Sequence, residues 1–448
     1  MISRRSALAL LGSTPLLMGR SAFAVPSRLP KTRDRPMAGD LDLSTLDVVD
    51  SHMHPVRRVL ISQAYAGQMK EFASLAVPPG DYPGKSALAA RAAQGAQTLV
   101  MDAPRRTGYF NYIARTYGVA PTLEGFDSVV APHITSDAEF TRYITSIFDR
   151  ERIRTVVLQA AEPAPSPPAT LIPANRYVWT TVASDFTRLK WAHSQGLTAL
   201  PDILAAIDRT MEAAVTAGCR GFKNLSAYYR PLALSRPSPQ EADAALQTLL
   251  KSSPVSTGVN DQPVFADAAT NSAQTTYEDY LFRHVYAKAG QLERPVIIHT
   301  AVALHPSLRT DFNDPRPLYA VFTDPDIQRA GTEFILIHSG YPTTDVVAAF
   351  ISQFSNVYTD VSFYSKYPGA LLEVYRSLLA LGPSTKIMHG SDANSVPEEI
   401  GYCAWNSRAV LARVLTEYRQ SFGWTQQDIQ VMAENVLHRN ARRLFRIG

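Results

Sequence analysis

The stretch Asp50-Ser51-His52-Met53-His54-Pro55 ends the first predicted strand of the chain. It follows the short apolar run Leu46-Asp47-Val48-Val49, which is typical of a buried strand. Because alternate residues of a strand share a face, His52 and His54 are expected to point the same way. Two imidazoles side by side can bind one divalent metal ion. The alternative is a chance pair of histidines at the junction of a strand and a loop.

Further apolar, β-branched runs follow this stretch, separated by helical patterns. The expected strands cover residues 46–49, 155–159, 177–182, 219–223, 295–299, 334–338, 357–361 and 386–392. Strands that alternate with helices in this number predict an α/β fold, the (β/α)8 TIM barrel. An open doubly wound sheet is the structural alternative. Such a sheet usually has a glycine-rich phosphate turn after its first strand, where this chain has His-Met-His.

The segment between the first two strands is unusually long. Residues 56–152 contain helical patterns at 86–101, 109–117 and 137–148, which predicts a helical insertion after the first strand. The barrel domain is expected to cover residues 46–448. Residues 25–45, rich in proline, arginine and aspartate, are expected to form an extended leader in front of it.

The first 24 residues have the composition of a targeting segment. Ser3-Arg4-Arg5-Ser6 precedes an apolar run from Ala7 to Met18, and Ala22-Phe23-Ala24 provides a small-x-small cleavage site. The paired arginines indicate a twin-arginine signal, with an ordinary secretory signal as the alternative. Gly12 and Pro15 interrupt the apolar run, which argues against a membrane anchor. We expect cleavage near Ala24, passage through the twin-arginine export machinery, and a periplasmic or secreted protein.

The composition excludes some classes of partner. The net charge of the full chain is +4, and removing Arg4, Arg5 and Arg20 with the signal lowers it to +1. No basic stripe suggests nucleic-acid binding. Two cysteines, Cys219 and Cys403, do not form a disulfide framework. We therefore expect a small-molecule substrate, and a homo-oligomer is compatible with the sequence.

Polar residues end several of the expected strands, where a barrel places its catalytic groups. His52, His54, His299 and Asp392 supply three imidazoles and one carboxylate. This is a typical set for a catalytic zinc ion that keeps one position open for water. The sequence therefore predicts a divalent metal, with zinc as the expected ion. Asp392 is expected to accept a proton from the attacking water as well.

Four other residues have predicted roles around this metal. His338 ends the sixth strand and is expected to be catalytic without being an essential ligand. Lys223 ends the fourth strand and has two interpretations: a charge that faces the substrate, or a carbamylated lysine that bridges a second ion. One ion is favoured. Tyr228 and Arg230 follow the fourth strand and are expected to bind substrate, with Arg230 on a carboxylate. An arginine packed on the surface is the alternative.

These motifs together resemble the amidohydrolase superfamily, and within it the amidohydrolase-related family of metal-dependent TIM barrels. The similarity covers most of the chain after the signal, and it is greatest to the amidohydrolase-like domain of nodulin-type proteins fused to glutamine synthetase. The motifs that carry it are DSHMHP, GFKNLSAYYR, RPVIIHT, FILIHSGYP, NVYTDVS, KIMHGSDANSVPE and ENVLHRNARRLF. The resemblance implies that His52, His54, His299 and Asp392 bind metal and that His338 is the catalytic histidine. It assigns no role to His389 or His305.

The predicted function is metal-dependent hydrolysis, in which an activated water attacks a C–N or C–O bond of a small carboxylated or amide substrate. The family that the chain resembles also contains non-oxidative decarboxylases of aromatic and muconate-type acids, so decarboxylation is the first alternative. A metal-binding barrel without catalytic activity is the second. The number of candidate ligands argues against the second alternative, because a barrel without activity has no need for all of them.

Overall fold

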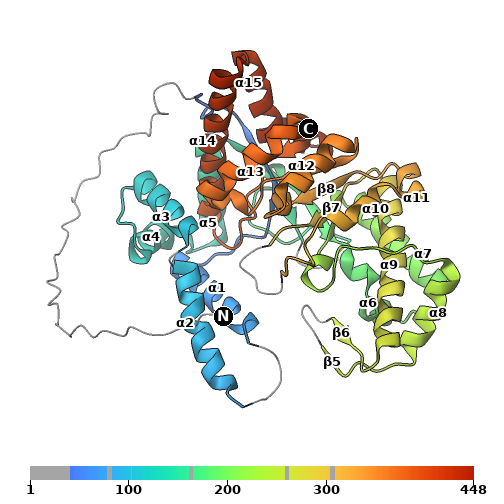
Figure 1. Cartoon of the computed structure of the whole chain (residues 1–448). Coiled ribbons are helices and arrows are strands. Elements are labelled where there is room, and N and C mark those ends of the chain that lie inside the picture. Colours follow the sequence, from blue (N-terminus) through green and yellow to red (C-terminus); the bar gives the residue numbers. More distant parts are fainter. Residues whose placement is uncertain (1–40, 78–82, 102, 161–164, 258–261, 303–307) are drawn as a thin grey trace, which may run out of the picture. The chain divides into compact units, whose positions relative to one another are not determined.

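Eight parallel strands form one sheet in the computed structural model, which describes residues 41–77, 83–101, 103–160, 165–257, 262–302 and 308–448 (Figure 1). The strands pair in the order of the chain. They are β1 (Val48–Met53), β2 (Ile153–Gln159), β3 (Tyr177–Val182), β4 (Cys219–Asn224), β7 (Val296–His299), β8 (Phe334–Ile337), β9 (Val357–Asp360) and β10 (Ile387–Met388). The expected signal peptide, most of the leader and His305 lie outside the described residues.

The sheet closes on itself between its first and last strands. The Ser51 N–H donates to the carbonyl of His389 at 2.9 Å, and the Asp392 N–H donates to the carbonyl of His52 at 2.8 Å. All neighbouring strands between β1 and β10 pair in parallel. The predicted TIM barrel is confirmed, and every expected strand is present.

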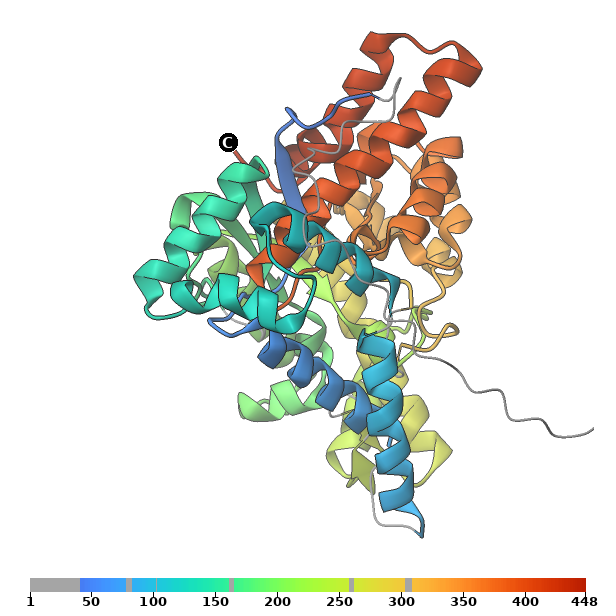
Figure 2. The ribbon, with the colours of Figure 1, turned by 90° about the vertical axis from the view of Figure 1, so that its left-hand side faces the viewer.

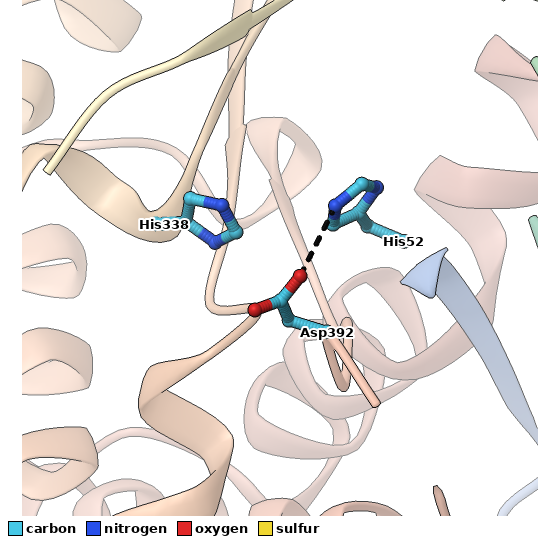
Figure 3. Close-up of side chains that lie close together, drawn as sticks. All are labelled: His52, His338 and Asp392. Carbon is cyan, nitrogen blue, oxygen red and sulfur yellow. Dashed lines mark ion pairs between the residues drawn. The ribbon is translucent and has the colours of Figure 1, made fainter. Parts of the chain in front are cut away.

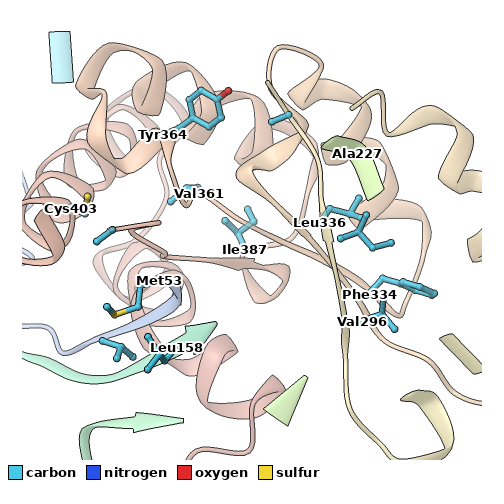
Figure 4. Close-up of a cluster of buried hydrophobic side chains, with 14 of the residues drawn as sticks. Met53, Leu158, Ala227, Val296, Phe334, Leu336, Val361, Tyr364, Ile387 and Cys403 are labelled. Carbon is cyan, nitrogen blue, oxygen red and sulfur yellow. The ribbon is translucent and has the colours of Figure 1, made fainter. Parts of the chain in front are cut away.

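Alternation along the strands builds two apolar cores. Val296, Ile298, Phe334 and Leu336 belong to the large core between the sheet and the helices. Figure 4 shows Val296, Phe334 and Leu336 in this core. The neighbouring residues on the other face meet in a second cluster, with residues from the C-terminal helix α16 (Asn440–Leu444). The strand members of this second cluster are Val49, Val157, Ile297, Ile335, Ile337, Tyr358 and Met388. By alternation, Lys223 and His299 lie on the inner face, near the carboxyl ends of β4 and β7.

An irregularity in β1 sets the direction of its two histidines. Val48 packs in the outer core and Val49 in the inner cluster, so regular alternation would turn His52 outward. The pairing of β1 with β2 shifts register between Asp50 and Met53, and Met53 lies in the outer core. The shift brings His52 and His54 to the inner face.

Helices fill the long segment after β1, as predicted. They are α1 (Ile61–Leu75), α2 (Lys85–Met101), α3 (Pro104–Tyr117), α4 (Leu123–Val130) and α5 (Asp137–Arg150). The sequence patterns found α2, α3 and α5 and missed α1 and α4. The N-terminus of α4 has an N-cap, because the Thr122 hydroxyl accepts a hydrogen bond from the Gly125 N–H. Figures 1 and 2 show α1 packed beside α2.

The other helices lie between the remaining strands or, for the last two, follow β10. They are α6 (Leu189–Ser194), α7 (Leu200–Thr216), α8 (Pro239–Leu250), α9 (Ala268–Gln291), α10 (Tyr319–Phe322), α11 (Pro325–Arg329), α12 (Thr344–Gln353), α13 (Pro368–Leu381), α14 (Pro397–Phe422) and α15 (Gln426–Glu434). A short antiparallel pair, β5 (Ser256–Thr257) and β6 (Pro263–Val264), precedes α9. Among the described residues, no helix is both long enough and apolar enough to span a membrane.

Candidate metal centre

Asp392 lies beside His52 of β1 and His54, which directly follows β1. Its Oδ1 atom is 3.3 Å from His52 Nε2 and 3.2 Å from His54 Nε2. His52 is buried, whereas the His54 side chain is 31% exposed and therefore lies nearer to solvent. Burial alone would raise the pKa of Asp392, but hydrogen bonds with the two imidazoles hold that pKa well below its usual value. The carboxylate is therefore ionised at neutral pH.

His338 completes a compact group with His52 and Asp392. One ligand atom from each residue lies within 4.8 Å of the other two. Figure 3 shows the carboxylate of Asp392 directed toward the space between the two rings. His338 begins the short 3-10 turn η7 (His338–Gly340) after β8, and its φ is 68°. The sequence predicted that this histidine is catalytic and not an essential ligand, but the geometry puts it with the candidate ligands.

His299 borders this group from β7. Its ring centroid is 4.6 Å from that of His338 and 4.7 Å from that of Tyr228. The Nε2 atom of His299 is buried and has no hydrogen-bond partner among the described residues. A buried ring nitrogen without a partner is costly, unless an ion or a substrate atom binds it. Tyr228 therefore lies beside a candidate ligand, and its role in binding substrate stays a prediction.

The donor set fits a divalent metal ion. Ligand atoms around a tetrahedral zinc ion lie about 3.3 Å apart when the bonds are about 2.0–2.1 Å long, and the Asp392 contacts have this spacing. Burial lowers the pKa of His52 and His299 well below the usual value and that of His338 to about 4. The rings are therefore neutral at pH 7, which is the form that binds metal.

Lys223 adds a buried amine to the same space. It is 1% exposed in β4, and burial lowers its pKa to about 7, against the attraction of Asp392 and Asp360. Its charge in turn lowers the pKa of His52, His299 and His338. Lys223 thus lies close to the candidate ligands, as predicted. Its two interpretations, a charge that faces the substrate and a carbamylated bridge to a second ion, stay open predictions.

Asp50 and Asp360 form a buried layer behind the histidines. Asp50 Oδ1 accepts from the backbone N–H groups of His52 at 3.2 Å and Ser391 at 2.8 Å. Asp360 Oδ1 accepts from the His338 N–H at 2.9 Å. Neither residue had a predicted role. Asp360 ends β9, so the rule that polar residues at strand ends build the site could have identified it.

Arg230 does not face the site, and its predicted role in binding a substrate carboxylate is not supported. Its Nη1 atom donates to Glu278 at 2.9 Å, and Nη2 donates to Asp279 and to the carbonyl of Ala233. Both acids belong to α9 and are buried. Because the two carboxylates already occupy the guanidinium, we interpret Arg230 as a structural residue that fixes the loop after β4 against α9.

His389 faces the helix layer. Its Nδ1 lies 2.9 Å from the hydroxyl of Ser407 on α14, and burial, with a smaller effect of Arg408, lowers its pKa to about 3. It follows Met388, which points into the barrel, so alternation directs it outward. His389 is therefore no candidate for the metal.

The chain belongs to the amidohydrolase family, because the sequence model of that family matches residues 183–447, more than half of the chain. It is 23% identical over 235 residues to protein fluG of Emericella nidulans, a match that covers 51% of this chain and 26% of fluG. The chain thus corresponds to about a quarter of that relative.

Solved structures of low sequence identity share the fold. A protein from Lactobacillus casei designated a metal-dependent hydrolase has a TM-score of 0.63 at 17% identity, covering 90% of this chain and 96% of its own. Uronate isomerase from Thermotoga maritima has a TM-score of 0.62 at 12% identity, covering 90% and 95%. Glucuronate isomerase from Caulobacter crescentus has a TM-score of 0.61 at 12% identity, covering 92% of each chain.

Proposed function

We propose that this protein is a metal-dependent hydrolase that cleaves a C–N or C–O bond of a small carboxylated or amide substrate. The observation that carries the proposal is the group of His52, His338 and Asp392 at the carboxyl ends of the strands. A divalent ion bound there, expected to be zinc, would supply Lewis acidity that lowers the pKa of a water molecule and polarises a carbonyl group.

The ligand assignment differs in part from the one made from sequence. His52, His338 and Asp392 would hold the ion, with His54 next to Asp392 and His299 next to His338. The neutral imidazoles and the ionised carboxylate have the protonation states that metal binding requires. This set leaves room for a substrate atom and a water molecule.

The residues around the ligands have roles in binding and proton transfer. The ionised Asp392 accepts a proton from the attacking water. The buried Lys223 faces the space where negative charge develops on the substrate, which it stabilises most effectively in its protonated form. Tyr228, packed against His299, orients the substrate.

Metal analysis and a substrate panel on the purified protein test this proposal. The panel contains amides, lactones, aromatic carboxylic acids and a hexuronic acid, the last because two similar structures are uronate isomerases. Hydrolysis is scored by incorporation of labelled oxygen from water, decarboxylation by release of carbon dioxide, and isomerisation by an unchanged product mass. We expect solvent oxygen in the product.

His52→Ala should abolish metal binding and turnover, whereas His193→Ala, at an exposed position of α6, should leave both unchanged. Activity without any metal would overturn the proposal. Turnover of only the aromatic acids or only the hexuronic acid would replace hydrolysis with decarboxylation or isomerisation.

A further inference from the structure

A buried chain of hydrogen bonds connects Asp360 to the ring of His338 through Ser362, and we call these three residues the relay. The Ser362 hydroxyl donates to Asp360 Oδ1 at 2.6 Å and lies 2.8 Å from His338 Nδ1. The carbonyl of Ser362 lies 3.1 Å from the same ring nitrogen. Asp360 and Ser362 are fully buried, so water does not compete for these contacts.

The direction of these bonds decides which ring nitrogen of His338 carries the proton. Asp360 Oδ1 already accepts from the backbone N–H groups of His338 and Ser362, so it acts as an acceptor and the Ser362 hydroxyl gives its one proton to it. The hydroxyl oxygen and the carbonyl oxygen then both face His338 Nδ1 as acceptors. A neutral imidazole has one N–H, and here Nδ1 must provide it. Nε2 is left with a free lone pair.

The same carboxylate also fixes the backbone on both sides of the relay. Asp360 Oδ1 accepts from the N–H groups of His338 at 2.9 Å and Ser362 at 3.1 Å, and Oδ2 accepts from the Ser51 hydroxyl at 2.9 Å. His338 has a φ of 68°, which is unfavourable for a residue with a side chain, so the surrounding contacts must hold it.

Gly390 leaves no space for this network to shift. A Cβ atom at Gly390 would lie 2.8 Å from both the Ser51 hydroxyl oxygen and the Ser362 Cβ, and 3.1 Å from Asp360 Oδ2. Atoms do not approach a Cβ this closely without moving, so the absence of a side chain lets the segment directly after β10 pack tightly against the relay. The relay is therefore held on several sides.

We propose that Asp360 and Ser362 are positioning residues that keep the proton of His338 on Nδ1, so that Nε2 faces His52 and Asp392 as an unprotonated ligand. The inference rests on the proposed metal centre and goes beyond it, because it names the residues that prepare one ligand before metal binds. Hydrogen bonds of this kind behind a ligating histidine typically change metal affinity about 10- to 100-fold.

The test has a readout that does not depend on activity. In the full-length mature protein labelled with 15N-histidine and freed of metal, NMR should show His338 with the proton on Nδ1. Ser362→Ala should lower the affinity for Zn²⁺, measured by chelator competition, about 10- to 100-fold.

The pair of Ser407 and His389 is a matched control, because it is another buried serine–histidine contact in the same protein, at 2.9 Å. Ser407→Ala should change the His389 signal and leave Zn²⁺ affinity as in the parent. Asp360→Asn is the second variant, and it should weaken Zn²⁺ binding while thermal unfolding shows a folded protein.

A proton on Nε2 of His338 in the parent would overturn the inference, as would unchanged Zn²⁺ affinity in Ser362→Ala. Failure of the proposed function has a different signature. A protein that binds Zn²⁺ and shows these effects but turns over no substrate would refute the hydrolase proposal and leave the positioning role supported.

Discussion

Lys366 donates a hydrogen bond from Nζ to the backbone carbonyl of Asp392 at 2.6 Å. Lys366 ends the 3-10 turn η8 (Tyr364–Lys366) after β9 and is buried, and its amine also lies 3.4 Å from Glu399 at the start of α14. Glu399 in turn accepts from the Asn394 N–H. Asp392 has a φ of 53°, so this lysine and its partner brace a strained backbone that carries a candidate ligand.

Lys366→Met should therefore weaken metal binding without removing a ligand. Loss of a hydrogen bond from a charged group costs about 1.5–3 kcal/mol. This corresponds to about a 10- to 160-fold lower affinity if the loop relaxes in the metal-free protein. Chelator competition measures the affinity, and the Lys366→Met/Glu399→Gln double variant separates this effect from that of leaving Glu399 unpaired.

Lys386 provides the matched control for this prediction. Its amine also donates to backbone carbonyls, those of Phe354 at 2.6 Å and Ser355 at 2.5 Å, but these precede β9 and lie at the opposite end of the strand. Lys386→Met should leave metal affinity unchanged. Equal losses of affinity in the Lys366 and Lys386 variants would show that both changes lower overall stability, and that Lys366 has no specific effect on the backbone at Asp392.

Arg230 is expected to affect stability and not substrate binding. Arg230→Met leaves Glu278 and Asp279 buried without their cation, and breaking a buried ion pair in this way costs about 3–5 kcal/mol. Chemical denaturation should show this loss, with metal content unchanged. Arg309→Met removes an exposed pair with Asp311, so it should cost no more than about 1 kcal/mol. A raised KM with unchanged stability would restore the role predicted from sequence.

The fold was predictable because the strands are continuous apolar runs whose ends carry polar residues. The positions of Lys223, His299 and Asp392 follow from that rule alone. His52 and His54 reach the inner face only through the register shift in β1, which a plain alternation does not contain. The inward direction of the two histidines therefore has a cause that plain alternation does not provide, and their role as metal ligands stays a prediction.

The partners of buried charges were not predictable. Arg230 is paired with acids about fifty positions away on α9, and nothing in the local sequence identifies that contact. His338 presents the same difficulty, because its grouping with the ligands depends on a turn with positive φ directly after β8. Long-range contacts of this kind are set by packing between elements and not by local propensity.

The arginine pair near the N-terminus should direct export. We propose that Arg4→Lys with Arg5→Lys blocks export of the full chain, because recognition of a twin-arginine signal requires both guanidinium groups. Cell fractionation should find the variant protein uncleaved and inside the cell. Arg20→Lys, in the same segment, should be exported normally. Normal export of the double variant would indicate an ordinary secretory route.

The lowered pKa of the buried His389 predicts that the protein loses stability as the solution becomes acidic. Its pKa is lowered to about 3 in the folded protein by burial, whereas an unfolded chain has a histidine pKa of about 6.5. The unfolded state thus binds more protons between these values, so the stability that His389 contributes is complete above pH 6.5 and is lost as the pH falls toward 3. His389→Gln should reduce the slope of unfolding free energy against pH, between pH 4 and 6, by up to about 1.4 kcal/mol per pH unit. An unchanged slope would contradict this assignment.

The chemical state of Lys223 determines whether the site can bind one metal ion or two. The described residues contain one group of three potential ligands with the spacing of a metal site, that of His52, His338 and Asp392. A second ion would need a bridging anion, and Lys223 can supply one only after reaction of its neutral amine with carbon dioxide. Burial lowers the pKa of this amine to about 7, so a neutral fraction exists and the two-metal alternative is chemically open.

We expect one equivalent of metal in the parent protein and one in Lys223→Met, with a rate reduced because the positive charge near the substrate is lost. Lys190→Met, at an exposed position of α6, should retain the full rate. Elemental analysis should be made with and without added bicarbonate, because bicarbonate supplies the carbon dioxide for carbamylation. A metal content that reaches two equivalents in the parent when bicarbonate is added, but stays at one in Lys223→Met, would establish a carbamylated lysine between two ions.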